Sequence, residues 1–319
     1  MEQYNFSSGF IEHYREITDW DVFEKYLRTP GRRSIRVNTL KITIPKLIER
    51  LSPCWQLEQI PWCSEGFRIS GRQVCGCGCV HDVKRLGDIP EHKSGLFYIQ
   101  EASSMIPAVV LDPKPGENIL DMCASPGSKT TQIAGYMKNT GSITASDVRA
   151  DRIAILKRNL ERMGVTNCTV LQMPGQQFKD VKFDRILLDP PCSGTGTLRG
   201  DPESIGKWDP KIAERLMYEQ RSLIHYAYCV LKRGGIMVYS TCSIEPVENE
   251  AVIDYLLKRH KKTGIEEIEM NAQACGLNRS KPILEYGGKS YDERIERTMR
   301  IMPQDNDTDG FFISKIRKL

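Results

Sequence analysis

From residue 118 onward, short apolar runs alternate with segments in which apolar residues recur every three or four positions. The short runs predict strands, and the recurring pattern predicts amphipathic helices. The predicted strands lie at about residues 118–122, 142–147, 168–172, 183–189 and 235–241. The predicted helices lie at about residues 129–137, 149–164, 210–231 and 247–260. Strands alternating with helices indicate an α/β fold with right-handed crossovers and a parallel sheet covered on both faces.

The residues before 118 follow a different pattern. A strand and then a helix are predicted within residues 34–51, whereas residues 309–316 alternate as a last strand lying beside the sheet would. At 319 residues, the chain is longer than a typical single core, which favours more than one domain. We therefore predict a helical extension at residues 1–30, a small α/β module at 31–95 and a large α/β domain at 96–319.

Composition places the chain among soluble globular proteins. Hydrophobic residues make up 40% and charged residues 27%, with a mean hydropathy of -0.41. No apolar run approaches the roughly 18 residues that span a bilayer, and the N-terminus does not resemble a signal peptide. We expect a cytoplasmic protein without membrane contact, whose 11 cysteines are reduced.

The charge balance is compatible with a polyanionic partner but is weak evidence for one. The net charge is +4 and the isoelectric point is about 8.4. Four arginines lie within residues 28–36, and the chain closes on "SKIRKL", so basic surface could gather near both ends. A solvated charged face explains the same residues.

Unusual residues follow the predicted strands at one edge of the sheet. Binding sites in parallel sheets lie in the loops at the carboxyl ends of strands. The loop "DMCASPGSKT" (residues 121–130) follows the first strand, Asp147 ends the second, "DPPCSG" (189–194) follows the fourth and "TCS" (241–243) follows the fifth. These loops are the candidate site.

The first of these loops favours a nucleoside-containing ligand. Its small residues and proline-glycine turn allow backbone N–H groups to approach a ligand closely. The loop matches neither the GxGxxG nor the GxxxxGK[ST] pattern, which counts against a dinucleotide or a triphosphate. Asp147 could accept hydrogen bonds from a ribose diol. A structural turn with a capping aspartate remains the alternative.

Cys192 and Cys242 are candidate nucleophiles because a thiolate attacks carbon readily. Asp189, three residues before Cys192, could hydrogen-bond the nitrogen edge of a heteroaromatic ring while sulfur attacks a ring carbon. Attack at carbon 6 of a cytosine would make carbon 5 able to take a methyl group from a sulfonium donor. A second thiol could then assist release. Buried structural cysteines are the alternative.

Six segments together resemble the Nop/Sun family of RNA 5-methylcytosine methyltransferases, including its compact archaeal-type tRNA members. They are "RVNTL", "QEASSMIP", "DMCASPGSKT", "DPPCSGTGT", "YSTCSIEPVENE" and "DTDGFF", and they span roughly residues 36–318. The resemblance implies a Rossmann-like methyltransferase sheet that uses S-adenosyl-L-methionine, preceded by an RNA-recognition-like module.

The resemblance also implies roles for individual residues. Cys242 is then the nucleophile, Cys192 assists product release, and Asp189 contacts the base and the cofactor region, with Lys129 near the base. The implied cofactor-binding residues are Cys123, Ala124, Ser125, Pro126, Gly127, Ser128, Lys129, Asp147, Arg152 and Asp189. One departure is Pro174, which stands where the family usually has an acid near the adenine. Gln172, Gln176 or backbone groups would have to make those contacts.

The remaining cysteines and histidines receive no role from the sequence. Alternation would put Cys75, Cys77, Cys79 and His81 on one face of a strand, but C-x-C-x-C departs from zinc-site spacing. A thiol-bearing glycine loop and a metal site both remain open, and we predict no metal. Companionless thiols and histidines without a partner acid are expected to be structural or exposed: Cys168, Cys229, Cys275, His13, His92, His225 and His260.

We therefore expect a monomeric enzyme that methylates carbon 5 of cytosine in RNA through a Cys242 adduct. The target nucleotide must leave its stack, which favours unpaired positions. Transfer RNA is the preferred substrate, and ribosomal RNA is the nearest alternative. An RNA-binding or assembly factor with a silent methyltransferase fold is a different class of function. A nicotinamide-dependent oxidoreductase is disfavoured by the absent GxGxxG.

Overall fold

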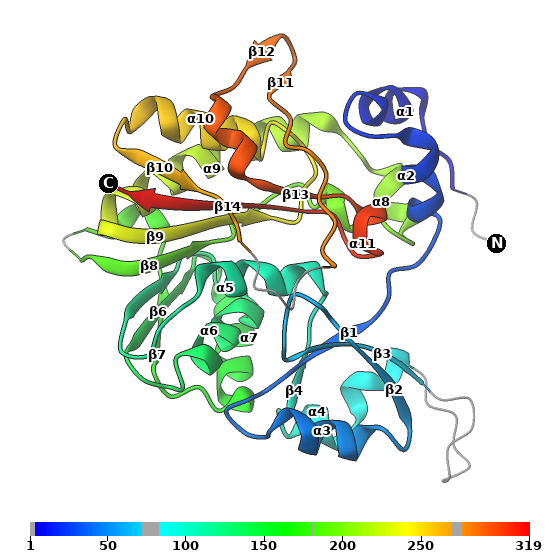
Figure 1. Ribbon diagram of the computed structural model, residues 1–319, viewed down its shortest axis with the longest axis vertical. Helices are drawn as coiled ribbons and strands as arrows, with labels where there is room; N and C mark the ends of the chain where they lie inside the picture. The colour runs from blue at the N-terminus through cyan, green and yellow to red at the C-terminus, as the bar shows by residue number, and fades with distance from the viewer. Residues whose placement is uncertain (1–3, 72–82, 180, 270–275) are drawn as a thin grey trace.

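The computed structural model describes residues 4–71, 83–179, 181–269 and 276–319 (Figure 1). Two helices open the chain, α1 (Ser8–Arg15) and α2 (Trp20–Leu27). A small antiparallel sheet of order β2-β3-β1-β4 follows. Its module consists of β1 (Ser34–Val37), α3 (Ile44–Leu51), β2 (Trp55–Gln59), β3 (Gly66–Gly71), α4 (Pro90–Lys93) and β4 (Phe97–Ile99).

The small sheet extends past residue 95, where the sequence predicts the end of the small module. β4 pairs with β1 in antiparallel register, with Ile35 opposite Ile99. The strand at Phe97–Ile99 is thus the last strand of the module. Its partner lies about 60 residues earlier in the chain, and no local pattern reveals such a pairing.

The second sheet confirms the α/β prediction and has the order β10-β14-β9-β8-β5-β6-β7, with β13 paired to β14. The pairs among β5, β6, β7, β8 and β9 are parallel. The strands are β5 (Asn118–Asp121), β6 (Ser142–Asp147), β7 (Cys168–Gln172), β8 (Phe183–Leu188), β9 (Leu231–Thr241), β10 (Thr263–Glu266), β13 (Met299–Ile301) and β14 (Phe311–Lys318).

β14 was expected to lie beside the sheet, but it is part of the sheet. It lies between β9 and β10 and is antiparallel to both. Its alternate side chains enter different apolar clusters: Phe311 and Ile313 pack on one face, whereas Phe312 and Ile316 pack on the other. β14 is therefore an interior strand, because it pairs with a neighbour on each edge, and apolar side chains cover both of its faces.

Helices cover both faces of this sheet (Figure 1). One cluster contains residues of α5 and α6, and the other contains residues of α9 and α10. The helices are α5 (Ile106–Leu111), α6 (Ser128–Tyr136), α7 (Ala150–Met163), α8 (Pro202–Gly206), α9 (Pro210–Val230), α10 (Glu250–Arg259) and α11 (Pro303–Asn306). Among the described helices, none combines the length and apolar character needed to cross a bilayer.

A buried ion pair joins α10 to β13. Arg300 Nε and Nη2 donate to the two carboxylate oxygens of Glu250 at 2.9 and 2.6 Å. Arg300 Nη1 donates to the carbonyl of Ile244 at 2.7 Å, two residues beyond Cys242. Both charged side chains are almost fully buried, with exposures of 2% and 0%. The pair therefore fixes the "TCS" loop against the last strands.

Substituting Arg300→Met should lower the free energy of unfolding by about 3–5 kcal/mol, because it leaves the Glu250 carboxylate buried without a partner. The Arg300→Met/Glu250→Leu double variant should recover most of this loss. Urea unfolding measures both. The exposed pair Lys207–Glu203 is the matched control, and Lys207→Met should change stability by less than about 0.5 kcal/mol. Equal losses in the single and double variants would contradict the assignment.

Candidate active site

The structure brings the two candidate cysteines together. The sulfur atoms of Cys192 and Cys242 lie 3.4 Å apart. Cys192 follows β8 and Cys242 follows β9, and these strands are parallel neighbours. Their carboxyl ends therefore open at the same edge of the sheet. Both thiols are half-buried, so they reach the surface of the site.

The buried carboxylate of Glu248 holds both cysteine loops. It accepts hydrogen bonds from the backbone N–H of Ser193 at 2.9 Å and from the hydroxyl of Ser243 at 2.5 Å. The Ser193 hydroxyl and the Gln220 amide also donate to it. Burial raises the pKa of Glu248, while these donors from Ser193, Ser243 and Gln220 lower it in part. The residue that follows each cysteine thus donates a hydrogen bond to the same carboxylate.

Gly196, the second glycine of "SGTGT", allows the backbone of this loop to lie close to two other segments. Gly196 N–H donates to the carbonyl of Cys242 at 2.9 Å, and Gly310 N–H donates to the carbonyl of Gly196 at 2.9 Å. A Cβ at Gly196 would lie 2.2 Å from the Gly310 carbonyl oxygen and 2.7 Å from that of Cys242. Any side chain would therefore push these segments apart.

The surroundings of the Cys192 thiol disfavour its thiolate form. The hydrogen bond with Cys242, followed by burial and the charges of Cys242, Glu248 and Asp189, raises the pKa of the Cys192 thiol well above its usual range. Cys192 therefore carries its proton at neutral pH. It can donate that proton toward the Cys242 sulfur, which stabilises negative charge on that atom.

Lys129 and Asp189 form an ion pair at the same edge. Lys129 Nζ lies 2.6 Å from Asp189 Oδ2, and the Ser240 hydroxyl donates to Asp189 Oδ1 at 2.9 Å. Burial lowers the pKa of Lys129, but the Asp189 carboxylate outweighs it, and the net shift is upward. Lys129 is therefore an ammonium donor beside the two thiols.

The loop before α6 is fixed from both sides. Ala124 N–H donates to the Ser146 carbonyl at 2.9 Å, and Arg152 Nη2 donates to the Ser125 carbonyl at 2.6 Å. Gly127 has φ +100°, and a Cβ there would lie 2.9 Å from Leu156 Cδ1. Cys123 and Ser128 are half-buried, and Pro126 is exposed. The loop is thus held with its backbone close to the strand ends.

The small module also supports this loop, through Arg36 of "RVNTL". Arg36 is 2% exposed. Its guanidinium donates to the Ser128 carbonyl at 2.7 Å, to the Thr131 hydroxyl at 2.7 Å and to the Gln100 side chain. These bonds join β1 of the module to the first turn of α6.

Asp147 presents a free acceptor at the end of β6. Its side chain is buried, and Oδ1 accepts a hydrogen bond from Arg149 N–H at 3.1 Å. Oδ2 has no hydrogen-bond partner among the described residues, although Arg152 Nε lies 3.5 Å away. A buried carboxylate oxygen without a donor is costly, so this atom fits a ligand hydroxyl.

The segment around Pro174 is close to the end of β6. Gln172 donates to the Val148 carbonyl at 3.4 Å, and Val148 is 56% exposed directly after Asp147. Gly175 packs tightly against Met122 of the first loop. Gln172 and the Val148 side chain therefore border the same space as Asp147.

Several assignments from the sequence remain predictions. Cys75, Cys77, Cys79, His81 and Cys275 lie outside the described residues. The roles of the individual site residues are also untested. Sequence reasoning gave no role to Glu248 or Arg36, although both lie in the motifs that carry the family resemblance.

The sulfur separation predicts that a mild thiol oxidant will close a Cys192–Cys242 disulfide, because 3.4 Å requires only a small movement to reach a bond of about 2.05 Å. Peptide mapping would detect it. Glu248→Ala should slow closure by roughly tenfold, since the loops lose their shared acceptor. Gln304→Ala, a substitution outside these loops, should leave the rate unchanged. A wild-type protein that does not close this disulfide would contradict the geometry.

Comparisons with known proteins identify relatives over the whole chain. Residues 108–317 match the family of 16S rRNA methyltransferase RsmB/F. Residues 6–102 match the N-terminal domain of 16S rRNA methyltransferase RsmF. The tRNA (cytosine(49)-C(5))-methyltransferase of Pyrococcus abyssi is 43% identical over 97% of this chain and 95% of its own length.

Two further relatives support the same assignment. Ribosomal RNA small subunit methyltransferase F of Escherichia coli is 38% identical over 98% of this chain, which spans 63% of the length of that relative. NSun6 from Pyrococcus horikoshii, solved with SFG, has a TM-score of 0.80 and 26% identity, with 99% of each chain covered. The chain therefore belongs to the RsmB/F family of methyltransferases.

Proposed function

We propose that the protein transfers a methyl group from S-adenosyl-L-methionine to carbon 5 of a cytosine in RNA, with tRNA as the substrate class. The observation that carries this proposal is the pair of sulfurs 3.4 Å apart, beside the ion pair of Lys129 and Asp189. A thiol pair alone would suit redox chemistry. A charged donor and a carboxylate acceptor beside it suit a polar heteroaromatic ring.

In this proposal Cys242 is the nucleophile and Cys192 assists product release. The Cys242 sulfur bonds to carbon 6, and carbon 5 becomes the nucleophile that takes the methyl group. S-adenosylhomocysteine is the leaving group of that transfer. A base or water at the site then takes the proton from carbon 5, and the electrons of that C–H bond restore the ring double bond as the sulfur–carbon bond breaks and releases the Cys242 thiolate. Cys192 carries a proton beside the Cys242 sulfur and can stabilise it as the sulfur departs.

Lys129 and Asp189 orient the base. The Asp189 carboxylate can accept a hydrogen bond from the amino edge of cytosine, while the Lys129 ammonium can donate to a ring acceptor. Their ion pair limits the movement of both groups, and Ser240 holds the second oxygen of Asp189. Groups that are held before substrate arrives lose little entropy on binding it.

The residues at the end of β6 fit the cofactor. S-adenosyl-L-methionine supplies the electrophilic methyl group when bound. The free Oδ2 of Asp147 suits a ribose hydroxyl, and exposed Val148 with Gln172 suits a flat apolar ring and its polar edge. Cys123 to Ser128 supply closely approaching backbone, and Arg152 holds that loop. A relative solved with SFG, an analogue of this cofactor, supports the choice.

A surface hollow next to the site suits an RNA strand. It has a volume of about 480 Å³ and is lined in part by Arg32, Arg33 and Thr197, together with the acids Glu101 and Asp309. Thr197 belongs to the "SGTGT" loop that follows Cys192, so one wall of the hollow is formed by a loop of the site. Arginines bind phosphates with planar, two-pronged hydrogen bonding. This supports a path for the backbone that flanks the target nucleotide.

Transfer RNA is favoured over ribosomal RNA by the extent of the match. The chain covers 95% of the Pyrococcus abyssi tRNA enzyme but 63% of the Escherichia coli enzyme named for small-subunit ribosomal RNA. Methylating transcripts of both RNAs, followed by bisulfite sequencing, distinguishes them. A silent assembly factor is disfavoured because Cys242, Asp189 and Lys129 are all present.

Cys242→Ala should reduce methyl transfer by roughly 10³-fold or more, because it removes the nucleophile. Cys192→Ala should instead accumulate a protein–RNA species that survives a denaturing gel. The double variant should form neither product nor adduct. Cys168→Ala is the control and should behave as the wild type. Turnover by Cys242→Ala at the wild-type rate would overturn the proposal.

Asp147→Ala should weaken binding of S-adenosylhomocysteine by roughly 10- to 100-fold, the usual effect of losing hydrogen bonds to a charged group. Isothermal titration calorimetry measures this directly. Asp151→Ala is the matched control, because Asp151 is an exposed acid nearby on α7 that pairs with Arg149. Unchanged affinity in Asp147→Ala would refute the role of this acid.

A further inference from the structure

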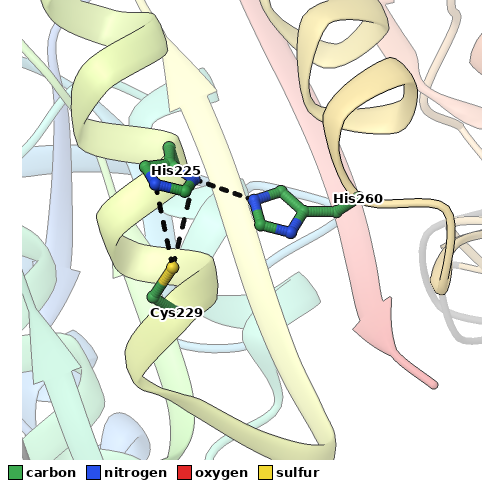
Figure 2. A group of neighbouring side chains, drawn as sticks. All are labelled: His225, Cys229 and His260. Carbon is green, nitrogen blue, oxygen red and sulfur yellow. Dashed lines mark hydrogen bonds between the residues drawn. The ribbon is translucent and has the colours of Figure 1, made fainter.

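A cluster of two histidines and a cysteine joins α9 to the end of α10. His225 and Cys229 lie four residues apart on α9, so one helical turn brings them to the same face. His260 follows α10 as its C-cap residue. Its Nε2 lies 2.8 Å from Nδ1 of His225. Figure 2 shows the two imidazole rings and the thiol close together.

The spacing of these atoms is close to that of metal ligands. Cys229 Sγ lies 4.0 Å from Nδ1 and 3.9 Å from Nε2 of His225. One candidate ligand atom from each residue falls within 4.8 Å of the others. Nitrogen and sulfur ligands of a tetrahedral zinc ion lie about 3.5 Å apart. Side-chain shifts of about 1 Å, which part the two imidazole nitrogens and bring the thiol closer, would therefore give a zinc geometry.

The cluster is accessible to an ion. All three side chains are half-buried. His260 also lines a surface hollow of about 420 Å³. Arg259 Nε donates to His225 Nδ1 at 3.1 Å, but Arg259 is exposed and can turn into solvent. Ligand exchange at His225 thus requires no change in the core.

Two lysines lie near the cluster, and the types of its ligand atoms indicate which metal ion it suits. Lys182 Nζ donates to the Cys229 carbonyl at 2.8 Å, and Lys318 Nζ donates to the Tyr228 carbonyl at 2.7 Å. Both ammonium groups are bound to backbone carbonyls rather than to the ligand atoms of the cluster. A thiolate with two imidazoles suits Zn²⁺, whereas Ca²⁺ and Mg²⁺ require oxygen ligands.

We propose that His225, Cys229 and His260 bind one Zn²⁺ ion, with water as the fourth ligand. The ion cross-links α9 to the residue after α10. The cluster lies at the start of β9, whereas Cys242 follows its end, and β9 has 11 residues. β9 pairs regularly with β8 only from Ile236 onward and is bulged before it, so at about 3.3 Å per residue the two sites are roughly 20 Å apart. The site therefore stabilises the fold and takes no part in methyl transfer.

The test measures zinc bound to the full-length reduced protein after dialysis against Zn²⁺. Cys229→Ser and His260→Ala should each bind one equivalent less than the wild type. Excess Zn²⁺ should raise the Tm of the wild type by roughly 5 °C at about 100 times Kd, and this rise should disappear in both variants. Co²⁺ should give a thiolate charge-transfer band that Cys229→Ser lacks.

Other thiols could bind the same ions, so matched variants are needed. His92→Ala and Cys168→Ser change residues of the same types outside the cluster and should retain the full zinc content. A Cys75→Ser/Cys77→Ser/Cys79→Ser variant should keep the Tm rise, and so should Cys192→Ser. Circular dichroism without metal confirms that every variant folds.

Two outcomes would contradict the proposed zinc site. One is a wild-type zinc content equal to that of Cys229→Ser and His260→Ala. The other is a loss of zinc confined to the Cys75→Ser/Cys77→Ser/Cys79→Ser or Cys192→Ser variants. Retention of the Tm rise in His260→Ala would also exclude the cross-link between α9 and the end of α10.

Discussion

One buried carboxylate, that of Glu248, determines whether the two cysteine loops meet. Ser193 and Ser243, the residues that follow Cys192 and Cys242, both donate to it. Without this acceptor, buried donors from two loops would be unsatisfied, and each such group costs about 1–3 kcal/mol. The arrangement of lowest free energy is therefore the one that places the two sulfur atoms 3.4 Å apart.

Other charged side chains hold the rest of the site in place in the same way, through partners on other elements. Lys129 on α6 pairs with Asp189 after β8, and Arg36 of the small module binds the backbone at the start of α6. Arg300 on β13 binds both Glu250 and the loop beyond Cys242. Each charged group has a partner from a different element. The site is consequently held in place by the same contacts that join the parts of the fold.

The N-terminal helix is part of the same network. Glu245, three residues after Cys242, accepts hydrogen bonds from the Tyr14 hydroxyl and from His13 Nε2, each at 2.7 Å. The sequence indicated no partner acid for His13 at motif spacing, because Glu245 lies 232 residues away. The place of β4 in the small sheet likewise depends on a distant partner, since β4 is recognised only by its pairing with β1.

The sequence by itself determined the α/β architecture, the loops at the strand ends and the family. The period of the apolar residues shows which face of each helix or strand is buried, and this predicts the architecture. Each motif is a contiguous stretch of the chain, so the sequence alone reveals the family. The tertiary structure alone decided the place of β14 between β9 and β10, the shared carboxylate of Glu248, and the meeting of His225, Cys229 and His260. These features depend on contacts between residues far apart in sequence, and local patterns carry no information about such contacts.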